Sequence, residues 1–353
     1  MNKLIYKDEL TKQDTNMTKG LAIILMVILH LFCRIDNLPY ECLKIGEVPL
    51  VYCIGQFADC CVVLYCFCSG YALRIICEKF DKSIDYYKNR LKSVFKFLIN
   101  YWIVLIVFSI VGLIFDKTGA FPGNLNDFLG KFFLYDLSYS TPWWFVFIYV
   151  LLVLLSRPVN IMIEKINPIV GNIFAFIIYL LAYNQRFNYS LSFDIPILDW
   201  AIDRMALLGT SMLPFIWGMY FYKYKVFSKI RQFVYRHFKN CQVIAISFFV
   251  LCAMIIGHGM VVTFFISPFT GIVTVLLFNI IDKKKFVNSI FNFLGNHSTN
   301  IWLTHMFFYL VLFKDFVFVA KYPVFIFLFM MFITICCSYI INLIYKPIIK
   351  LIK

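Results

Sequence analysis

The stretch NMTKGLAIILMVILHLFCR, residues 16–34, is an apolar run that contains two ionisable side chains, Lys19 and His30. If the run is a helix, these two residues lie about three turns apart on one face, with roughly 16 Å between their Cα atoms. Ionisable groups are costly in lipid and normally face a bundle interior or a water-filled cavity. The open alternative is that Lys19 extends to the membrane interface and His30 only bonds a neighbouring helix.

The composition of the whole chain is that of a membrane protein. Of its 353 residues, 62% are hydrophobic and 15% are charged, whereas soluble domains are about half apolar and a quarter charged. Apolar runs of about 20 residues recur along the chain, which indicates a multi-pass membrane protein. No segment is polar enough to form a soluble module, so residues 1–353 are expected to form a single membrane-embedded domain. The first run lacks a small-residue cleavage site and is expected to be a retained helix.

The order of the apolar runs predicts an all-α transmembrane bundle of about ten helices. The first begins near residue 17, and the other nine cover about 50–77, 94–115, 142–156, 169–182, 205–222, 241–256, 261–281, 291–313 and 322–345. Ten crossings place both termini on one side of the membrane. Most of the 33 Lys and Arg residues fall on that side, and the positive-inside rule then predicts that both termini are cytosolic.

The net charge and the cysteines argue against two other classes of protein. The net charge is +14, but the basic residues form short clusters at the ends of apolar runs, where they set orientation, so no nucleic-acid partner is expected. The 12 cysteines lie mostly inside apolar runs and behave there as small hydrophobic residues. None belongs to a paired CxxC set, so neither a metal site nor a disulfide framework is expected.

Two further stretches carry polar groups inside apolar runs. CFCSGYALR, residues 66–74, places Ser69 and Gly70 near the cytosolic end of the second helix, with Arg74 one turn on. The alternative is a small-residue packing site with Arg74 at the interface.

FLGNHSTNIWLTHMFF, residues 293–308, is predicted to contain a break at Gly295 and a helix cap at Ser298 or Thr299. His305 then lies about two turns beyond Ser298 on the same face. A lone histidine in such a helix is usually a packing residue, although two histidines in one bundle favour a shared site.

The chain resembles the acyltransferase 3 family, integral-membrane enzymes that O-acylate surface polysaccharides and related glycoconjugates. Lys19 and His30 match the family's basic-x10-His motif, and CFCSGYAL is similar to its Phe-rich Ser-Gly-Tyr stretch. TPWWFVFIYVLLVLL, residues 141–155, resembles its Trp-Phe helix start, and LGNHSTNIWLTHMFF resembles its Leu-Gly-x-x-Ser segment that ends in His. The resemblance spans nearly the whole chain in the same order.

One part of the family pattern differs in this sequence. The family often carries two arginines three residues apart and then Pro-Tyr after the second helix. Here Ser93 stands three residues after Arg90, in place of the second arginine, and Asn100-Tyr101 replaces Pro-Tyr. Lys92 and Lys96 are the expected substitutes for the second arginine.

The resemblance implies an acyl-CoA donor, usually acetyl-CoA, that arrives from the cytosol, and a glycan acceptor at the cell (plasma or inner) membrane. His30 is the expected general base for the acceptor hydroxyl. Lys19 is expected to orient the donor or to stabilise charge on the thioester oxygen, and His305 is a second candidate base or a partner of His30. Residues expected to bind the donor are Ser69, Arg74, Arg90, Lys92 and Lys96, together with the basic cluster at 223–239.

Two other functions use the same polar interior. One is a transporter or flippase for a glycan intermediate, and the other is an assembly subunit of a surface-polymer complex without catalysis.

Overall fold

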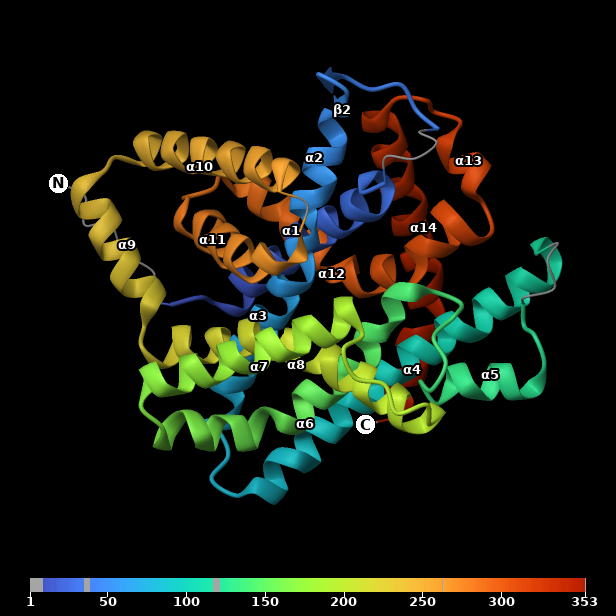
Figure 1. The fold of residues 1–353 in the computed structure, drawn as a ribbon, viewed down its shortest axis with the longest axis horizontal. Coiled ribbons are helices and arrows are strands. Elements are labelled where there is room, and N and C mark those ends of the chain that lie inside the picture. The colour runs from blue at the N-terminus through green and yellow to red at the C-terminus, as the bar shows by residue number, and fades with distance from the viewer. Residues whose placement is uncertain (1–8, 35–38, 117–120, 262, 353) are drawn as a thin grey trace.

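The computed structural model describes residues 9–34, 39–116, 121–261 and 263–352. Within them the chain is helical apart from loops and a short hairpin of β1 (Lys44–Ile45) and β2 (Val48–Pro49) (Figure 1). The long helices are α1 (Lys12–Phe32), α3 (Cys61–Cys77), α4 (Ser83–Phe115), α6 (Trp144–Lys165), α7 (Pro168–Asn188), α8 (Pro196–Lys223), α10 (Asn240–Met260), α11 (Ser267–Ile280), α12 (Lys285–Met306) and α14 (Pro323–Leu351). The short ones are α2 (Leu50–Phe57), η1 (Ala58–Cys60), α5 (Leu125–Phe132), η2 (Thr141–Trp143), α9 (Val226–His237), η3 (Phe264–Ile266), η4 (Phe307–Val311) and α13 (Lys314–Phe318).

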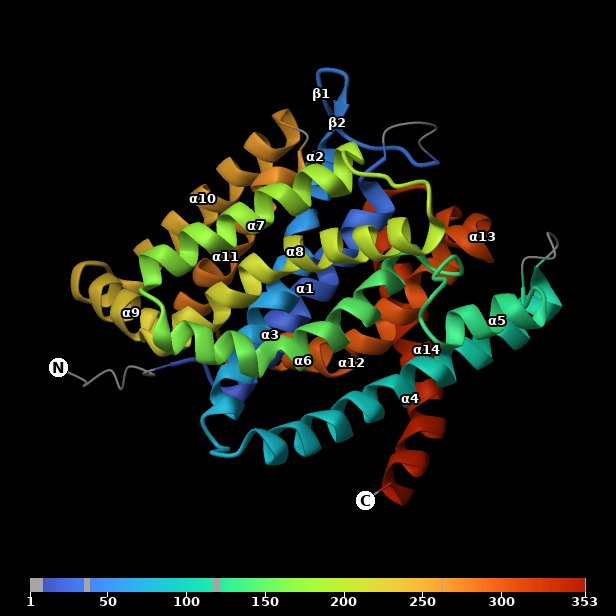
Figure 2. The same ribbon diagram turned by 60° about the horizontal axis from the view of Figure 1, so that its bottom comes forward.

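The prediction of an all-α transmembrane bundle is confirmed. Eight helices of the described chain are long and apolar enough to cross a membrane by length and composition, and each coincides with one of the ten predicted runs. The other two runs correspond to Phe264–Ile280, which is shorter, and to α12, whose Asn, Ser, Thr and His residues lower its hydropathy. Figure 2 shows the β1–β2 hairpin at one end of the bundle and the C-terminus at the other.

Several helices extend beyond the apolar runs, for local reasons. The first helix begins at Lys12 because Thr11 and Asp14 form a reciprocal capping box there. Helix α6, which corresponds to the fourth predicted run, continues past Ser156 to Lys165 although Pro158 lies inside it. Proline removes one helical donor and leaves the carbonyl four residues earlier without its usual partner. Here that carbonyl, of Leu154, accepts a hydrogen bond from the Tyr87 hydroxyl at 3.1 Å.

Two pairs of helices cross so closely that only glycine fits at the contact. A Cβ on Gly20 of α1 would lie 2.1 Å from the carbonyl oxygen of Phe291 in α12. A Cβ on Gly295 of α12 would lie 2.1 Å from the carbonyl oxygen of Asn16. Gly70 of α3 meets α8 in the same way. Small residues let membrane helices approach backbone to backbone, so these positions fix how α1 and α3 sit against their partners.

The Gly20 contact is a test of this packing. We expect Gly20→Ala to destabilise the protein by about 2 kcal/mol or more, because the added methyl group overpacks a contact made by backbone atoms. The measurement is the thermal unfolding midpoint of the full chain in detergent.

The matched control is Gly257→Ala in α10, where a Cβ would meet nothing within 4 Å. That variant should be neutral or slightly stabilised, because alanine favours a helix over glycine by about 1 kcal/mol. Equal effects of the two substitutions would contradict the close contact.

The alternation of the helices predicts which loops share a side of the membrane. Asn126 in α5 and Asn188 at the end of α7 are exposed and belong to the side opposite that of Lys229 in α9. Single cysteines at these positions, in a background without reactive native cysteines, should label from outside at 126 and 188 and from the cytosol at 229. Cytosolic labelling at 126 or 188 would rule out the topology. The predicted cytosolic termini themselves include residues 1–8 and 353, which lie outside the described residues.

Candidate active site

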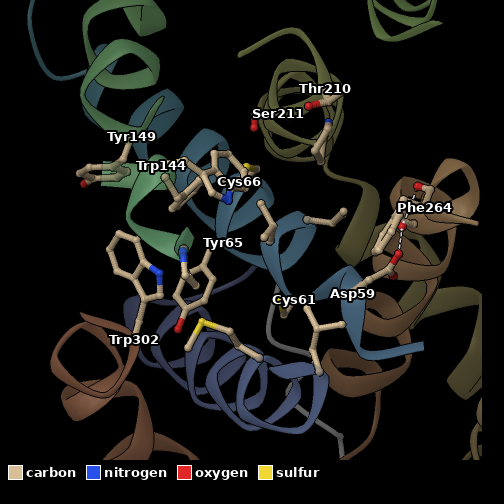
Figure 3. A pocket seen from close by; sticks show the side chains of 18 of the residues that line it. Asp59, Cys61, Tyr65, Cys66, Trp144, Tyr149, Thr210, Ser211, Phe264 and Trp302 are labelled. Carbon is tan, nitrogen blue, oxygen red and sulfur yellow. Dashed lines mark hydrogen bonds between the residues drawn. The ribbon is translucent and has the colours of Figure 1, made fainter. Parts of the chain in front are cut away.

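A cavity of about 380 Å³ lies in the centre of the bundle, between α1, α3, α6, α7, α8 and α12. Its wall is mostly apolar and aromatic, and it includes Lys19, His30 and Ser69. In the view of Figure 3, Tyr65 stands between Trp302 on one side and Asp59 on the other. The stripe of α1 that carries Lys19 and His30 therefore faces this cavity.

Lys19 lies in the half of α1 that is nearer its N-terminus. Its side chain is partly exposed to the cavity, and no hydrogen bond or ion pair to Nζ is formed within the described residues. Its carbonyl oxygen is the part that has a partner, the Tyr65 hydroxyl at 3.5 Å. An ammonium group in an apolar wall is stabilised by an anionic partner, so this position suits a negatively charged ligand.

His30 and His305 lie together near the C-terminal ends of α1 and α12. Their ring centroids are 4.8 Å apart, and the ring of Tyr309 lies 6.2 Å from that of His30. His30 lines the cavity, whereas His305 is fully buried behind it and does not. The close α1–α12 contact at Gly20 and Gly295 is what brings the two histidines into register.

The hydrogen bonds of His305 fix its tautomer. Nδ1 lies 2.7 Å from the carbonyl oxygen of Trp302, and a carbonyl can only accept, so Nδ1 carries the hydrogen of a neutral ring. Nε2 is buried and has no hydrogen-bond partner among the described residues. His305 is thus held rigidly against His30 with a free lone pair, which fits a positioning role for the His30 ring.

The serines of the two motifs lie on the cavity wall. The Ser69 hydroxyl donates to the Tyr65 carbonyl at 2.7 Å, and the Ser298 hydroxyl donates to the Gly295 carbonyl at 2.8 Å. The predicted break at Gly295 and cap at Ser298 or Thr299 are wrong, because α12 begins at Lys285 and runs through all three. Gly295 serves the close contact with α1 instead.

The other predicted donor-binding residues do not line the cavity. Arg74 is buried and is held by Asn160, Glu164 and, at 3.1 Å, Glu78, so it ties α3 to α6.

Three basic residues of α4 lie outside the cavity as well. Lys92 is exposed, Arg90 and Lys96 are half-buried, and Arg90 donates to the neighbouring Asn89. Of the 223–239 cluster, Lys223 pairs with Glu164 at 3.2 Å and Arg231 donates to the Asn279 carbonyl at 2.6 Å. The exposed cations of this group are Lys92, Lys225, Lys229, Arg236 and Lys239.

Sequence reasoning missed two charged residues of the cavity, Asp59 and Arg186. Asp59 is a carboxylate inside an apolar run, which is itself a signal for a functional position. Arg186 follows the apolar part of the fifth run and looked like a loop residue, but α7 continues to Asn188. Within the described residues, no group of three or more His, Cys, Asp or Glu side chains is placed to hold a metal ion.

These features define the chain as a multi-pass membrane protein with a polar site inside its helix bundle. The family model for the acyltransferase 3 domain, described as an acyltransferase domain, matches residues 14–343. The chain therefore belongs to the acyltransferase 3 family and is a membrane acyltransferase. Comparison with curated proteins and with solved structures finds no match.

Proposed function

We propose that the protein transfers an acetyl group from acetyl-CoA, taken from the cytosol, to a hydroxyl group of a cell-surface polysaccharide or its precursor in the cell membrane. Family membership supports acyl transfer. The observation that carries the assignment of roles is that Lys19 and His30 line one cavity, each without a hydrogen-bond partner for its side chain among the described residues. Both groups are thus free for a ligand.

The chemistry needs one base, and His30 is the candidate with access to the cavity. A neutral imidazole takes the proton of the acceptor hydroxyl as its oxygen attacks the thioester carbonyl. The tetrahedral intermediate then expels the CoA thiolate, which receives that proton from the imidazolium, so an ester and free CoA leave. His305, packed against His30, would hold the ring in the orientation that this proton transfer requires.

Lys19 is better placed to bind the phosphate groups of the acyl-CoA donor than to stabilise charge on the reacting carbonyl group. About eleven helical steps separate Lys19 from His30, which is roughly 16 Å between Cα atoms and too far for both to act at one carbonyl group. CoA carries phosphate charges, and an unpaired ammonium group binds an anion strongly in an apolar wall. We therefore assign Lys19 to the anionic part of the donor, with the thioester reaching toward His30.

The test is transfer of label from acetyl-CoA to a glycan by the purified full-length protein in lipid nanodiscs. Wild-type protein should place the label on the glycan, and His30→Ala should not. Movement of a glycan across vesicle membranes without labelling would favour a transporter. If neither activity occurs but surface polymer is lost from cells lacking the protein, a structural subunit is favoured.

A further inference from the structure

One region of the cavity wall carries an arginine that has no role in the proposed binding of acyl-CoA or in the proposed proton transfer at His30. Arg186 lines the cavity, and its Nη1 donates to the Thr210 hydroxyl at 3.2 Å. The guanidinium carbon lies 5.0 Å from the centre of the Trp144 ring and 5.3 Å from that of Phe187. No carboxylate lies within 4.0 Å of it in the described part of the chain. A guanidinium group has five N–H donors, so most of them remain for a ligand.

A carboxylate lies on the same cavity wall. Asp59, in η1, is 7% exposed. Its Oδ2 accepts a hydrogen bond from the Ser267 hydroxyl and lies 3.7 Å from His258 Nε2, while Oδ1 has no hydrogen-bond partner among the described residues. Asp59 and Arg186 line the same cavity and form no ion pair with each other. The cavity wall thus holds a guanidinium group and a carboxyl group that do not bond each other.

Aromatic rings complete this region. Trp144, Tyr183, Phe187 and Phe264 all line the cavity, and Phe187 and Phe264 stack at 5.4 Å with an interplanar angle of 8°. Flat apolar walls with a few fixed polar groups are the usual form of a small-molecule site. Figure 3 shows Asp59 beside Phe264 at this edge of the cavity.

The location separates this region from the donor side. Arg186 lies two residues before the end of α7, and Phe264 opens η3 after the loop that follows α10. The end of α7 and the start of η3 both belong to the side of the bundle opposite the one predicted to be cytosolic. Lys19 lies toward the other side, near the start of α1. Asp59 and Arg186 therefore lie toward the side opposite the one from which the acyl-CoA donor is expected.

The geometry points to a subsite for the acceptor between Asp59 and Arg186 that takes a neutral, polyhydroxylated sugar ring; this assignment rests on the proposed function. A sugar hydroxyl both donates and accepts, so neighbouring hydroxyls of one ring satisfy the carboxylate and the guanidinium together. An acidic ring would bring a second carboxyl group into the cavity beside that of Asp59, so a neutral ring is favoured. The aromatic walls pack against the apolar faces of the ring.

The experiment uses the full-length protein in nanodiscs, labelled acetyl-CoA, and methyl hexopyranosides and methyl hexuronides as acceptor probes. Asp59→Asn and Arg186→Gln should each raise the acceptor KM about tenfold or more, since a hydrogen bond to a charged group contributes about 1.5–3 kcal/mol. The Kd of acetyl-CoA should stay within about twofold. Arg204→Gln is the matched control, because Arg204 stacks on Trp200 outside the cavity and its loss should leave both constants unchanged.

A second measurement on the wild-type protein does not depend on the folding of variants. Among accepted hexopyranosides, removal of one of the bridging hydroxyls should lower kcat/KM about tenfold or more, because the charged group it met is left unpaired. A preference for hexuronides, equal rates for all deoxy sugars, or an unchanged acceptor KM in folded variants would each overturn the sugar subsite while leaving acyl transfer intact. Absence of transfer to any alcohol by the wild-type protein would instead overturn the proposed function.

Discussion

Replacing His30 with alanine should lower the turnover number for acyl transfer by a factor on the order of 10² or more. His30 is the imidazole that lines the cavity, and His305 behind it is fully buried and cannot reach a substrate without rearrangement. The Kd of acetyl-CoA should change by less than about threefold, because the ring is assigned to the acceptor hydroxyl. Steady-state rates at saturating acetyl-CoA, with binding measured separately by calorimetry, give both quantities.

The matched control is His237→Ala, which removes an exposed histidine on α9, outside the cavity. That variant should keep normal turnover. The wild-type rate should fall at acid pH as the base becomes protonated, and the residual rate of His30→Ala should lack that dependence. Near-normal turnover in His30→Ala with an unchanged acidic limb would place the base elsewhere, and His305 would be the next residue to test.

The sequence was sufficient to predict the helix bundle and the face of α1 that Lys19 and His30 share. Long apolar runs have few alternatives to transmembrane helices, because backbone polar groups cannot stay unpaired in lipid. The eleven-residue spacing of Lys19 and His30 determines a shared face wherever the segment is helical. Helix ends were less predictable, since hydropathy marks where lipid contact ends and not where the backbone stops being helical. Thr11 and Asp14 extend α1 toward the N-terminus, and the Tyr87 hydroxyl lets α6 continue past Pro158.

The composition of the cavity could be predicted only in part. Ser69 and His30 came from motifs, but Asp59 and Arg186 lie on η1 and α7, which meet only after the helices pack. Arg74 illustrates the opposite limit. It follows directly after a motif, yet its guanidinium group is engaged by Asn160 and Glu164 from α6. Such long-range partners have no signal in one sequence, because they depend on which helices become neighbours.

Replacing Lys19 with glutamine should raise the KM for acetyl-CoA by about 10- to 100-fold, the loss expected for a charge-assisted hydrogen bond of about 1.5–3 kcal/mol. Lys19 has no ion pair or hydrogen bond to Nζ among the described residues, so its charge is available to the donor. If Lys19 holds the anionic part of the donor, the inhibition constant of free CoA should rise by the same factor, since CoA lacks only the acetyl group.

The comparison with CoA separates the two roles considered for Lys19. A lysine that stabilised charge on the thioester oxygen would act only in the transition state, so Lys19→Gln would then lower kcat and leave CoA binding unchanged. Lys12→Gln is the matched control, because Lys12 is exposed on the same helix and does not line the cavity. Roughly 16 Å of helix between Lys19 and His30 makes the first outcome the expected one, because a side chain bound to the donor at that distance from the base cannot also contact the reacting carbonyl group.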